Sequence, residues 1–160
     1  MVLTTLDYCN ILLLGASDKD LRPLKLIINK SVRLIYNLKL STHVTPFVKQ
    51  AHFLPIKERI KFKACMIGFK IFNCQAPEYL IKDFSKFVPT SQMHLREGPG
   101  RDRFMFDVNF KESVNRVLSI EIKKQWNSIP LHIRKSPSIE CFKSRLKTHF
   151  FIKSYNICAV

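Results

Sequence analysis

Apolar side chains recur every three or four residues over most of this chain, which is the spacing of an amphipathic α-helix. The pattern is clearest over residues 21–35, where one narrow helical face is apolar and the opposite face carries Arg22, Lys30 and Arg33. The apolar face consists of Leu21, Leu24, Ile28, Val32 and Ile35. A chain with this spacing buries its apolar faces by packing helices together, so we expect a mainly α protein.

A second long helix, expected over residues 56–73, is apolar on two sides. One face carries Ile56, Ile60, Ala64, Ile67 and Ile71, and the other carries Phe62, Met66 and Phe69. The cations Arg59, Lys63 and Lys70 form a stripe between these two faces. A helix that is apolar on two sides must bury both against neighbours, so we expect this helix at the centre of the fold.

Prolines mark where the other helices begin. The chain has eight prolines and only four glycines. Four prolines, namely Pro46, Pro55, Pro77 and Pro137, each precede an amphipathic run, where the first helical turn tolerates proline. We expect the first helix over residues 3–14 and a cap from Ser17 or Asp18 on the helix that follows. Ser136 is expected to cap the last helix.

Residues 88–102 are the least helical part of the chain, because proline and glycine lie there among polar residues. Over residues 103–110, phenylalanine and valine alternate with largely polar residues, a period of two that favours a short strand. The expected fold is therefore mainly α with a short β element around residues 103–110. The expected division is a helical part over residues 1–86, a loop and short strand over 87–112, and a C-terminal helical part over 113–160, together forming one incomplete domain.

The chain carries 27 basic and 12 acidic residues, a net charge of +15. The excess is even, with +7 over residues 1–80 and +8 over residues 81–160, so the basic residues belong to the folded body. This charge excludes an acidic interaction protein and favours a polyanionic partner, either nucleic acid or an anionic membrane surface. The alternative is that lysine mainly keeps a phenylalanine-rich chain in solution, although modest charge of either sign would achieve that.

The sequence contains no pattern typical of catalysis, metal binding or cofactor binding. Its five histidines are isolated from one another and from the five cysteines, and it has neither a glycine-rich phosphate loop nor a pair of metal-binding aspartates. We therefore expect no catalytic residue, no metal and no cofactor. Because a CxxC pair and a signal peptide are both missing, we expect a reduced, intracellular chain in the nucleus or cytoplasm. The longest apolar run, residues 11–16, is too short to span a bilayer, so no membrane partner is expected.

Several short strings follow one another in a recognisable order. They are residues 6–10 (LDYCN), 43–46 (HVTP), 52–60 (HFLPIKERI), 126–130 (WNSIP), 136–139 (SPSI) and 146–150 (LKTHF). Together they resemble the C-terminal region of a LINE-type, non-LTR retrotransposon reverse transcriptase of the jockey-like kind. No single string is diagnostic, whereas the ordered set is specific and spans most of the chain.

The resemblance implies the thumb of the polymerase and the segment beyond it, and therefore a helical, thumb-like bundle. In that family the catalytic aspartates lie upstream, in the palm, and nothing like the family's Ala-Asp-Asp strand occurs in this chain. The resemblance thus implies a fragment or truncated copy of an RNA-directed DNA polymerase that is inactive alone. Its implied partners are RNA and DNA in a template–primer duplex, together with the missing palm and fingers of the same polyprotein.

Surface charge, rather than a family motif, selects the residues expected to bind nucleic acid. They are Arg22, Lys25, Lys30, Arg33, Arg59, Lys63 and Lys70. Cations on helices neutralise phosphates, and such contacts follow the backbone without reading the bases. The alternative is a structural or interaction scaffold with no nucleic-acid binding of its own. A third reading is binding to a membrane surface by the basic amphipathic helix at residues 56–73.

Overall fold

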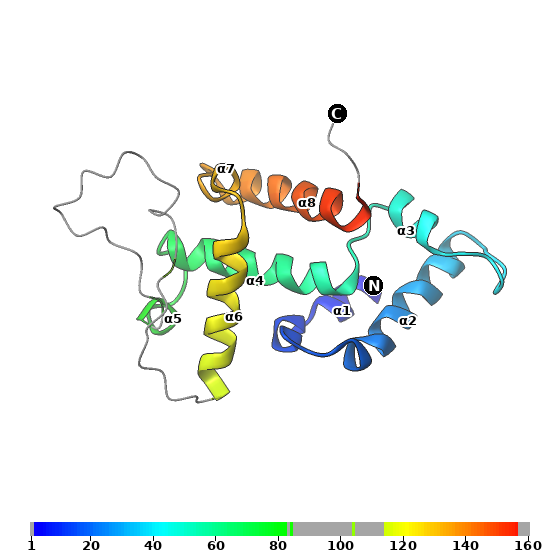
Figure 1. The fold of residues 1–160 in the computed structure, drawn as a ribbon, viewed down its shortest axis with the longest axis horizontal. Coiled ribbons are helices and arrows are strands. Elements are labelled where there is room, and N and C mark those ends of the chain that lie inside the picture. The colour runs from blue at the N-terminus through cyan, green and yellow to red at the C-terminus, as the bar shows by residue number, and fades with distance from the viewer. Residues whose placement is uncertain (1, 83, 85–103, 105–113, 157–160) are drawn as a thin grey trace. The chain divides into compact units, whose positions relative to one another are not determined.

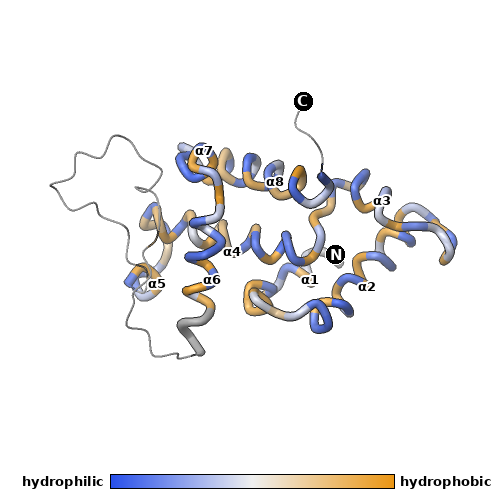
Figure 2. Tube along the Cα trace, viewed as in Figure 1, coloured by the Kyte–Doolittle hydropathy of each residue, from blue (hydrophilic) through white to orange (hydrophobic). Residues whose placement is uncertain are grey.

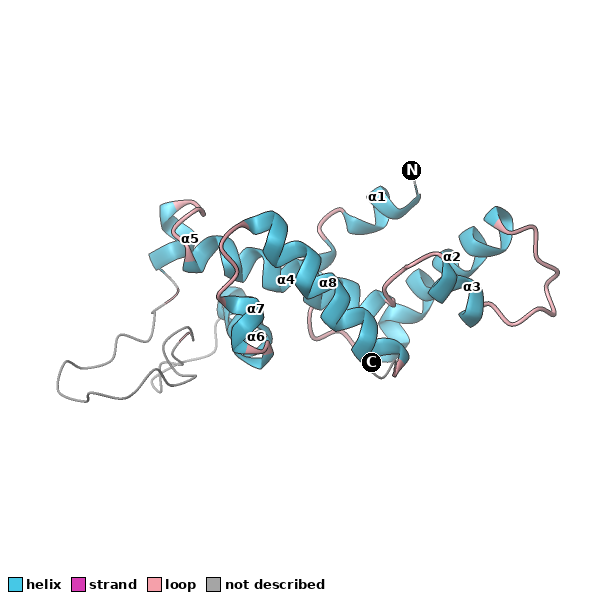
Figure 3. Cartoon of the chain, turned by 90° about the horizontal axis from the view of Figure 1, so that it is seen from above, coloured by secondary structure: helices cyan, strands magenta, loops and turns pink. Residues whose placement is uncertain are grey.

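The computed structural model describes residues 2–82, 84, 104 and 114–156 (Figure 1). Within these residues it contains eight α-helices and one 3-10 helix, joined by loops and turns, and no strand (Figure 3). The expected mainly α fold is confirmed. The short strand expected around residues 103–110 lies outside the described residues, apart from Phe104.

The chain divides into two compact units. Unit 1 consists of Met1–Phe62 and Lys147–Val160, and unit 2 consists of Lys63–Leu146. Two long helices, α4 (Ile56–Phe72) and α8 (Ile139–Tyr155), each contribute one part to unit 1 and another part to unit 2. The boundaries expected after residues 86 and 112 fall outside the described residues and stay predictions.

Unit 1 is built from two short helices, one 3-10 helix, one complete long helix and parts of two others around an aliphatic core. In chain order these are α1 (Val2–Asp7), the 3-10 helix η1 (Asn10–Leu13), α2 (Asp18–Ile35), α3 (Thr45–Gln50), the start of α4 and the end of α8. The buried core consists of Leu21, Ile28, Val32, Val44, Ile56 and Ile60. Hydrophobic and hydrophilic residues alternate along α2, as an amphipathic helix requires (Figure 2).

Helix α2 begins at a reciprocal cap formed by Ser17 and Asp20. The Ser17 hydroxyl accepts a hydrogen bond from the Asp20 N–H, and the Asp20 carboxylate accepts one from the Ser17 N–H at 3.3 Å. This arrangement satisfies N–H groups that the first turn leaves without partners. Of the two caps expected from the sequence, Ser17 is the one that forms.

The buried face of α2 ends earlier than the periodicity predicted. Leu21, Ile28 and Val32 are buried, but Ile35 is 65% exposed, so its placement on the buried face was wrong. Helix α2 ends at Ile35, and the ring of the following residue, Tyr36, packs against Phe47 of α3 with ring centroids 5.3 Å apart. The first residue after the helix therefore provides the apolar contact that was expected from its last residue.

The helix expected over residues 3–14 is interrupted. Helix α1 ends at Asp7, Cys9 adopts a left-handed backbone conformation with φ of 51°, and a 3-10 turn follows. The Asp7 carboxylate accepts hydrogen bonds from the side chains of Asn10 and Arg59. The contact with Arg59 holds the end of α1 against α4. Because Arg59 lies far along the chain, the spacing of apolar residues near Asp7 could not predict this contact.

Unit 2 has an aromatic core centred on Trp126. It consists of the rest of α4, α5 (Glu78–Lys82), α6 (Val114–Ser128), α7 (Leu131–Arg134) and the start of α8. The Trp126 ring is fully buried and stacks on Phe72 of α4 with centroids 5.4 Å apart. Phe69 of α4 stacks in turn on Phe142 of α8 at 4.4 Å. Trp126 therefore packs against the part of α4 that belongs to unit 2.

Two polar contacts in unit 2 refine the expected boundaries. The Ser138 hydroxyl accepts a hydrogen bond from the Cys141 N–H at 3.2 Å and caps α8. Ser136, the expected cap, instead donates its hydroxyl to the Ile133 carbonyl at 2.7 Å, so the predicted cap was two residues early.

The side chain of Asn127 connects Phe104 to α6. Its amide oxygen accepts a hydrogen bond from the Phe104 N–H at 3.0 Å, and its amide nitrogen donates one to the Phe104 carbonyl at 2.9 Å.

Candidate nucleic-acid interface

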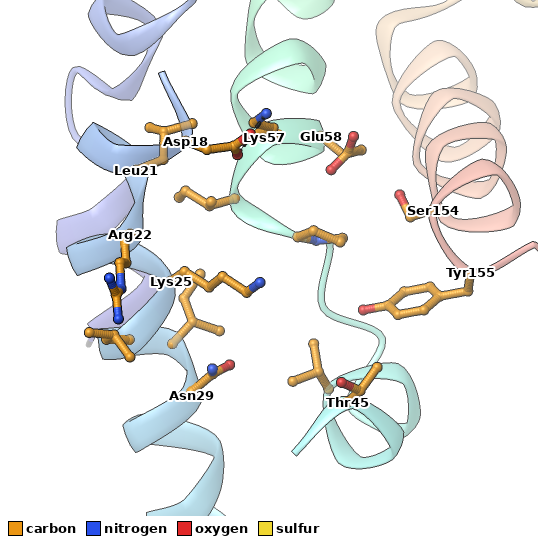
Figure 4. Close-up of a pocket in the computed structure, with 15 residues that line it drawn as sticks. Asp18, Leu21, Arg22, Lys25, Asn29, Thr45, Lys57, Glu58, Ser154 and Tyr155 are labelled. Carbon is orange, nitrogen blue, oxygen red and sulfur yellow. Dashed lines mark ion pairs between the residues drawn. The ribbon is translucent and has the colours of Figure 1, made fainter. Parts of the chain in front are cut away.

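Unit 1 contains a pocket of about 660 Å³ whose walls come from α2, α3, the first turn of α4 and the end of α8 (Figure 4). Its lining is mainly apolar and includes Leu21, Ile28, Val48 and Ile56. Pro55 starts α4 beside this lining, so the proline that sets the helix boundary also shapes the pocket. Small-molecule sites in proteins typically have this size and this mixture of apolar walls and a few polar groups.

The polar groups of the pocket approach it from opposite walls. Lys25 and Asn29 extend from α2, while the ring of Tyr155 extends from α8 on the other side (Figure 4). The Tyr155 hydroxyl donates to the Phe53 carbonyl at 2.8 Å, which fixes the ring in place. Burial raises the pKa of Tyr155, and the negative charge of Glu58 raises it further, so this phenol stays protonated at neutral pH.

The acidic groups at the pocket are already neutralised by lysines. Asp18 pairs with Lys57 at 2.7 Å, and Glu58 pairs with Lys61 at 3.6 Å. The hydrogen bond and the charge of Lys57 lower the pKa of Asp18, with a smaller contribution from the charge of Lys25. The pocket therefore keeps two cations, Arg22 and Lys25, that form no ion pair with any residue in the described part of the chain.

The structure brings four of the seven expected binding residues together on α2. Arg22 and Lys25 line the pocket, and Lys30 is exposed one to two turns further along the same helix. Arg33 is half-buried and donates to the Lys39 carbonyl at 2.6 Å, which holds its guanidinium against the chain that follows α2. Arg22, Lys25 and Lys30 are therefore three exposed cations of α2, with Lys25 and Lys30 about 140° apart around the helix because each residue advances by about 100°.

The other three expected residues lie on α4 and differ in their surroundings. Arg59 is half-buried, and its guanidinium binds both carboxylate oxygens of Asp7, with Nη2 to Oδ2 at 2.7 Å. Its charge is therefore neutralised within unit 1. Lys63 and Lys70 belong to unit 2, where Lys63 is half-buried and Lys70 is exposed. Arg59 acts here as a structural contact, which the sequence pattern did not distinguish from a surface cation.

Sequence reasoning missed three polar residues that line the pocket, namely Asn29, Thr45 and Tyr155. Asn29 follows Lys25 by one turn of α2, and this spacing was a usable signal. Thr45 lines the pocket from the start of α3, where the sequence suggested only a helix boundary. No sequence pattern predicted that Tyr155 lines the pocket. The residue lies at the end of α8, far along the chain from the other lining residues, and only the fold places it in unit 1.

The described residues offer neither a metal site nor a membrane span. Residues 2–82, 84, 104 and 114–156 contain no group of three or more histidine, cysteine, aspartate or glutamate side chains able to hold a metal ion. The helices in the same ranges are too short or too polar to cross a membrane.

Comparison of the whole chain with known proteins adds no information about its fold or its candidate site. No protein-family model, no curated protein and no solved structure matches it.

Proposed function

We propose that this chain is the noncatalytic C-terminal region of a non-LTR retrotransposon reverse transcriptase, and that it binds the backbone of an RNA/DNA template–primer duplex through α2. The observation that carries the proposal is the set of three exposed cations on α2, Arg22, Lys25 and Lys30, none of which is in an ion pair with a described residue. Helix-borne cations of this kind suit phosphate contacts that are independent of sequence. The proposal locates the chain in the nucleus or cytoplasm, where RNA and DNA meet.

The charge balance of unit 1 supports this assignment. Its residues include twelve basic and four acidic side chains. Asp7, Asp18 and Glu58 each pair with a basic residue, and Asp20 belongs to the cap of α2. Because the acidic groups are engaged, the remaining basic groups give this unit a positive surface that attracts polyanions.

The proposed contacts divide the seven expected residues by their surroundings. Arg22, Lys25 and Lys30 contact phosphates directly, while Arg33 is held by its hydrogen bond to the Lys39 carbonyl. Lys63 and Lys70 contribute only general positive charge. Arg59 stabilises unit 1 by binding Asp7 and makes no nucleic-acid contact.

Binding across a range of salt concentrations tests the proposal. Fluorescence anisotropy of a labelled RNA/DNA duplex should show affinity falling steeply as salt rises, because each phosphate contact releases counterions. In the triple variant Arg22→Gln, Lys25→Gln and Lys30→Gln, the slope of log affinity against log salt should decrease by about 2 to 3.

The matched control is the triple variant Lys39→Gln, Lys49→Gln and Lys153→Gln. These three lysines are exposed, belong to unit 1 and lie outside α2. The net charge changes equally in both variants, so the control should keep most of the slope. An equal loss of slope in the two variants would show that α2 has no special role, and a wild type without salt-dependent binding would remove the proposal altogether.

A scaffold that binds no nucleic acid is the second candidate, and one observation favours it. Several large apolar side chains of unit 1 are exposed, among them Leu26, Leu34, Ile35 and Leu40. Exposed apolar side chains in such numbers are typical of surfaces that another protein covers. A scaffold should associate through these residues, so Leu34→Ser with Leu40→Ser should reduce self-association in analytical ultracentrifugation while duplex binding stays absent throughout.

A further inference from the structure

We propose that the pocket of unit 1 takes one unpaired nucleotide of the bound nucleic acid, with the base against the apolar lining and the phosphate on Arg22 and Lys25. The inference rests on the proposed function, because it names which part of the nucleic acid this site receives. Phosphate contacts alone do not distinguish a paired from an unpaired nucleotide, whereas a nucleotide in the pocket would make the protein prefer a duplex that contains an unpaired one.

The size and lining of the pocket suit a planar base. Its volume of about 660 Å³ lies within the range of sites that enclose small ligands. Leu21, Ile28, Val48 and Ile56 offer apolar surface, and the Tyr155 ring stands on the opposite wall (Figure 4). Proteins that hold an extruded base place it between apolar and aromatic side chains in this way.

Two uncommitted polar side chains distinguish a base from a purely apolar ligand. Asn29 and Thr45 both line the pocket, and neither side chain hydrogen-bonds to another described residue. An asparagine amide can donate and accept at once along the edge of a base, and a threonine hydroxyl can do the same at a single atom. A hydrocarbon ligand would leave both groups unpaired, whereas a base would satisfy them.

The cations at the pocket provide a place for the phosphate. Lys57 already neutralises Asp18, so Arg22 and Lys25 remain to meet an anion. Both lie on α2 three residues apart, and therefore on neighbouring positions of the helix surface. Because Arg22 and Lys25 themselves line the pocket, a strand whose phosphate they bind can insert the attached nucleotide into it.

The test compares two labelled RNA/DNA duplexes that differ only by one unpaired adenine nucleotide within the DNA strand. The wild type should bind the duplex with the unpaired nucleotide about tenfold more tightly, since contacts between a base and protein side chains contribute on that scale. The double variant Asn29→Leu with Thr45→Val keeps the approximate shape of the pocket and removes the two side-chain groups proposed to hydrogen-bond the base. We expect it to lose most of this preference and to bind the fully paired duplex as the wild type does.

The matched control is Gln50→Leu, an equivalent polar-to-apolar change at an exposed position of α3 outside the pocket. It should retain the full preference. Equal wild-type affinity for the two duplexes, or an unchanged preference in the double variant, would overturn the pocket assignment while leaving backbone binding intact. Failure of both duplexes to bind would instead overturn the proposed function on which the inference rests.

Discussion

Unit 1 and unit 2 are both helical, but different side chains fill their cores. Unit 1 packs leucine, isoleucine and valine from α2 and the start of α4, and it leaves several large apolar residues on its surface. Unit 2 surrounds Trp126 with phenylalanine rings from two helices, α4 and α8, and with Phe104. Stacked rings bury large areas with few side chains, so unit 2 concentrates its apolar burial at one point, whereas unit 1 spreads it along α2.

Unit 2 has exposed cations, such as Lys70, but it also buries two others. In unit 2, Lys123 is 1% exposed and lies over the Phe84 ring, with Nζ 5.3 Å from the centroid. Arg134 is also buried, and its Nε donates to the Ile129 carbonyl at 3.0 Å. In unit 1, by contrast, Arg22, Lys25 and Lys30 remain at the surface. The cations behind the net charge of +15 are therefore of two kinds, buried and exposed, and only the exposed ones can bind a polyanion.

The largest expected effect is on the aromatic core. Trp126→Ala should destabilise unit 2 by about 4 kcal/mol, because a large buried side chain is lost and a cavity remains. Amide hydrogen exchange followed by mass spectrometry should show that protection decreases in α6 and in the later turns of α4. Val32→Ala is the corresponding change in unit 1 and should reduce protection mainly in α2. If either substitution reduced the protection of amide hydrogens equally in both units, the two cores would not be independent of each other.

The second effect concerns the ion pair that holds α1 to α4. The Asp7 and Arg59 side chains are only 21% and 19% exposed, so Arg59→Leu leaves a carboxylate in a largely desolvated place. The expected cost is about 2 kcal/mol in urea denaturation. Asp7→Asn combined with Arg59→Leu should cost less than the sum of the two single changes, because the partners are coupled. Strict additivity would show that the pair does not stabilise unit 1.

The third effect is the loss of a helix cap. Ser17→Ala removes the hydroxyl that accepts from the Asp20 N–H and should destabilise α2 by about 1 kcal/mol. Ser17→Asp keeps an acceptor at the same place and should restore most of that stability. If neither variant differed from the wild type, packing of the aliphatic core alone would determine where α2 begins.

The accuracy of the sequence analysis depended on the distance between the interacting residues. Helices α2 and α4 were predicted closely, because their periodicity and their capping or proline signals lie within a few residues. The break after Asp7 was missed, since it depends on Arg59, 52 residues away. The pocket was missed for the same reason, because Tyr155 joins it from the end of α8. Local patterns thus specified the helices, while the candidate site required contacts between distant residues.

The smallest effect, a pH titration, tests whether the cations of the pocket are uncommitted. Asp18 is fully exposed, and Lys57 lowers its pKa. A carboxylate with a lowered pKa in the folded state stabilises the fold above its unfolded pKa of about 4, and this contribution is lost as the pH falls through the folded value. Lys57→Gln should therefore return the Asp18 pKa, measured by NMR of its carboxyl carbon, towards its ordinary value, whereas Lys61→Gln should leave it lowered.

A second outcome of the same titration would weaken the comparison between the two units. If the pKa of Asp18 stayed equally low in Lys57→Gln, another cation would have taken the place of Lys57. Lys25 is the candidate, because its charge already contributes to the lowered pKa. Lys25 would then be committed to Asp18 rather than to a phosphate, and the direct phosphate contacts proposed for α2 would be reduced to Arg22 and Lys30.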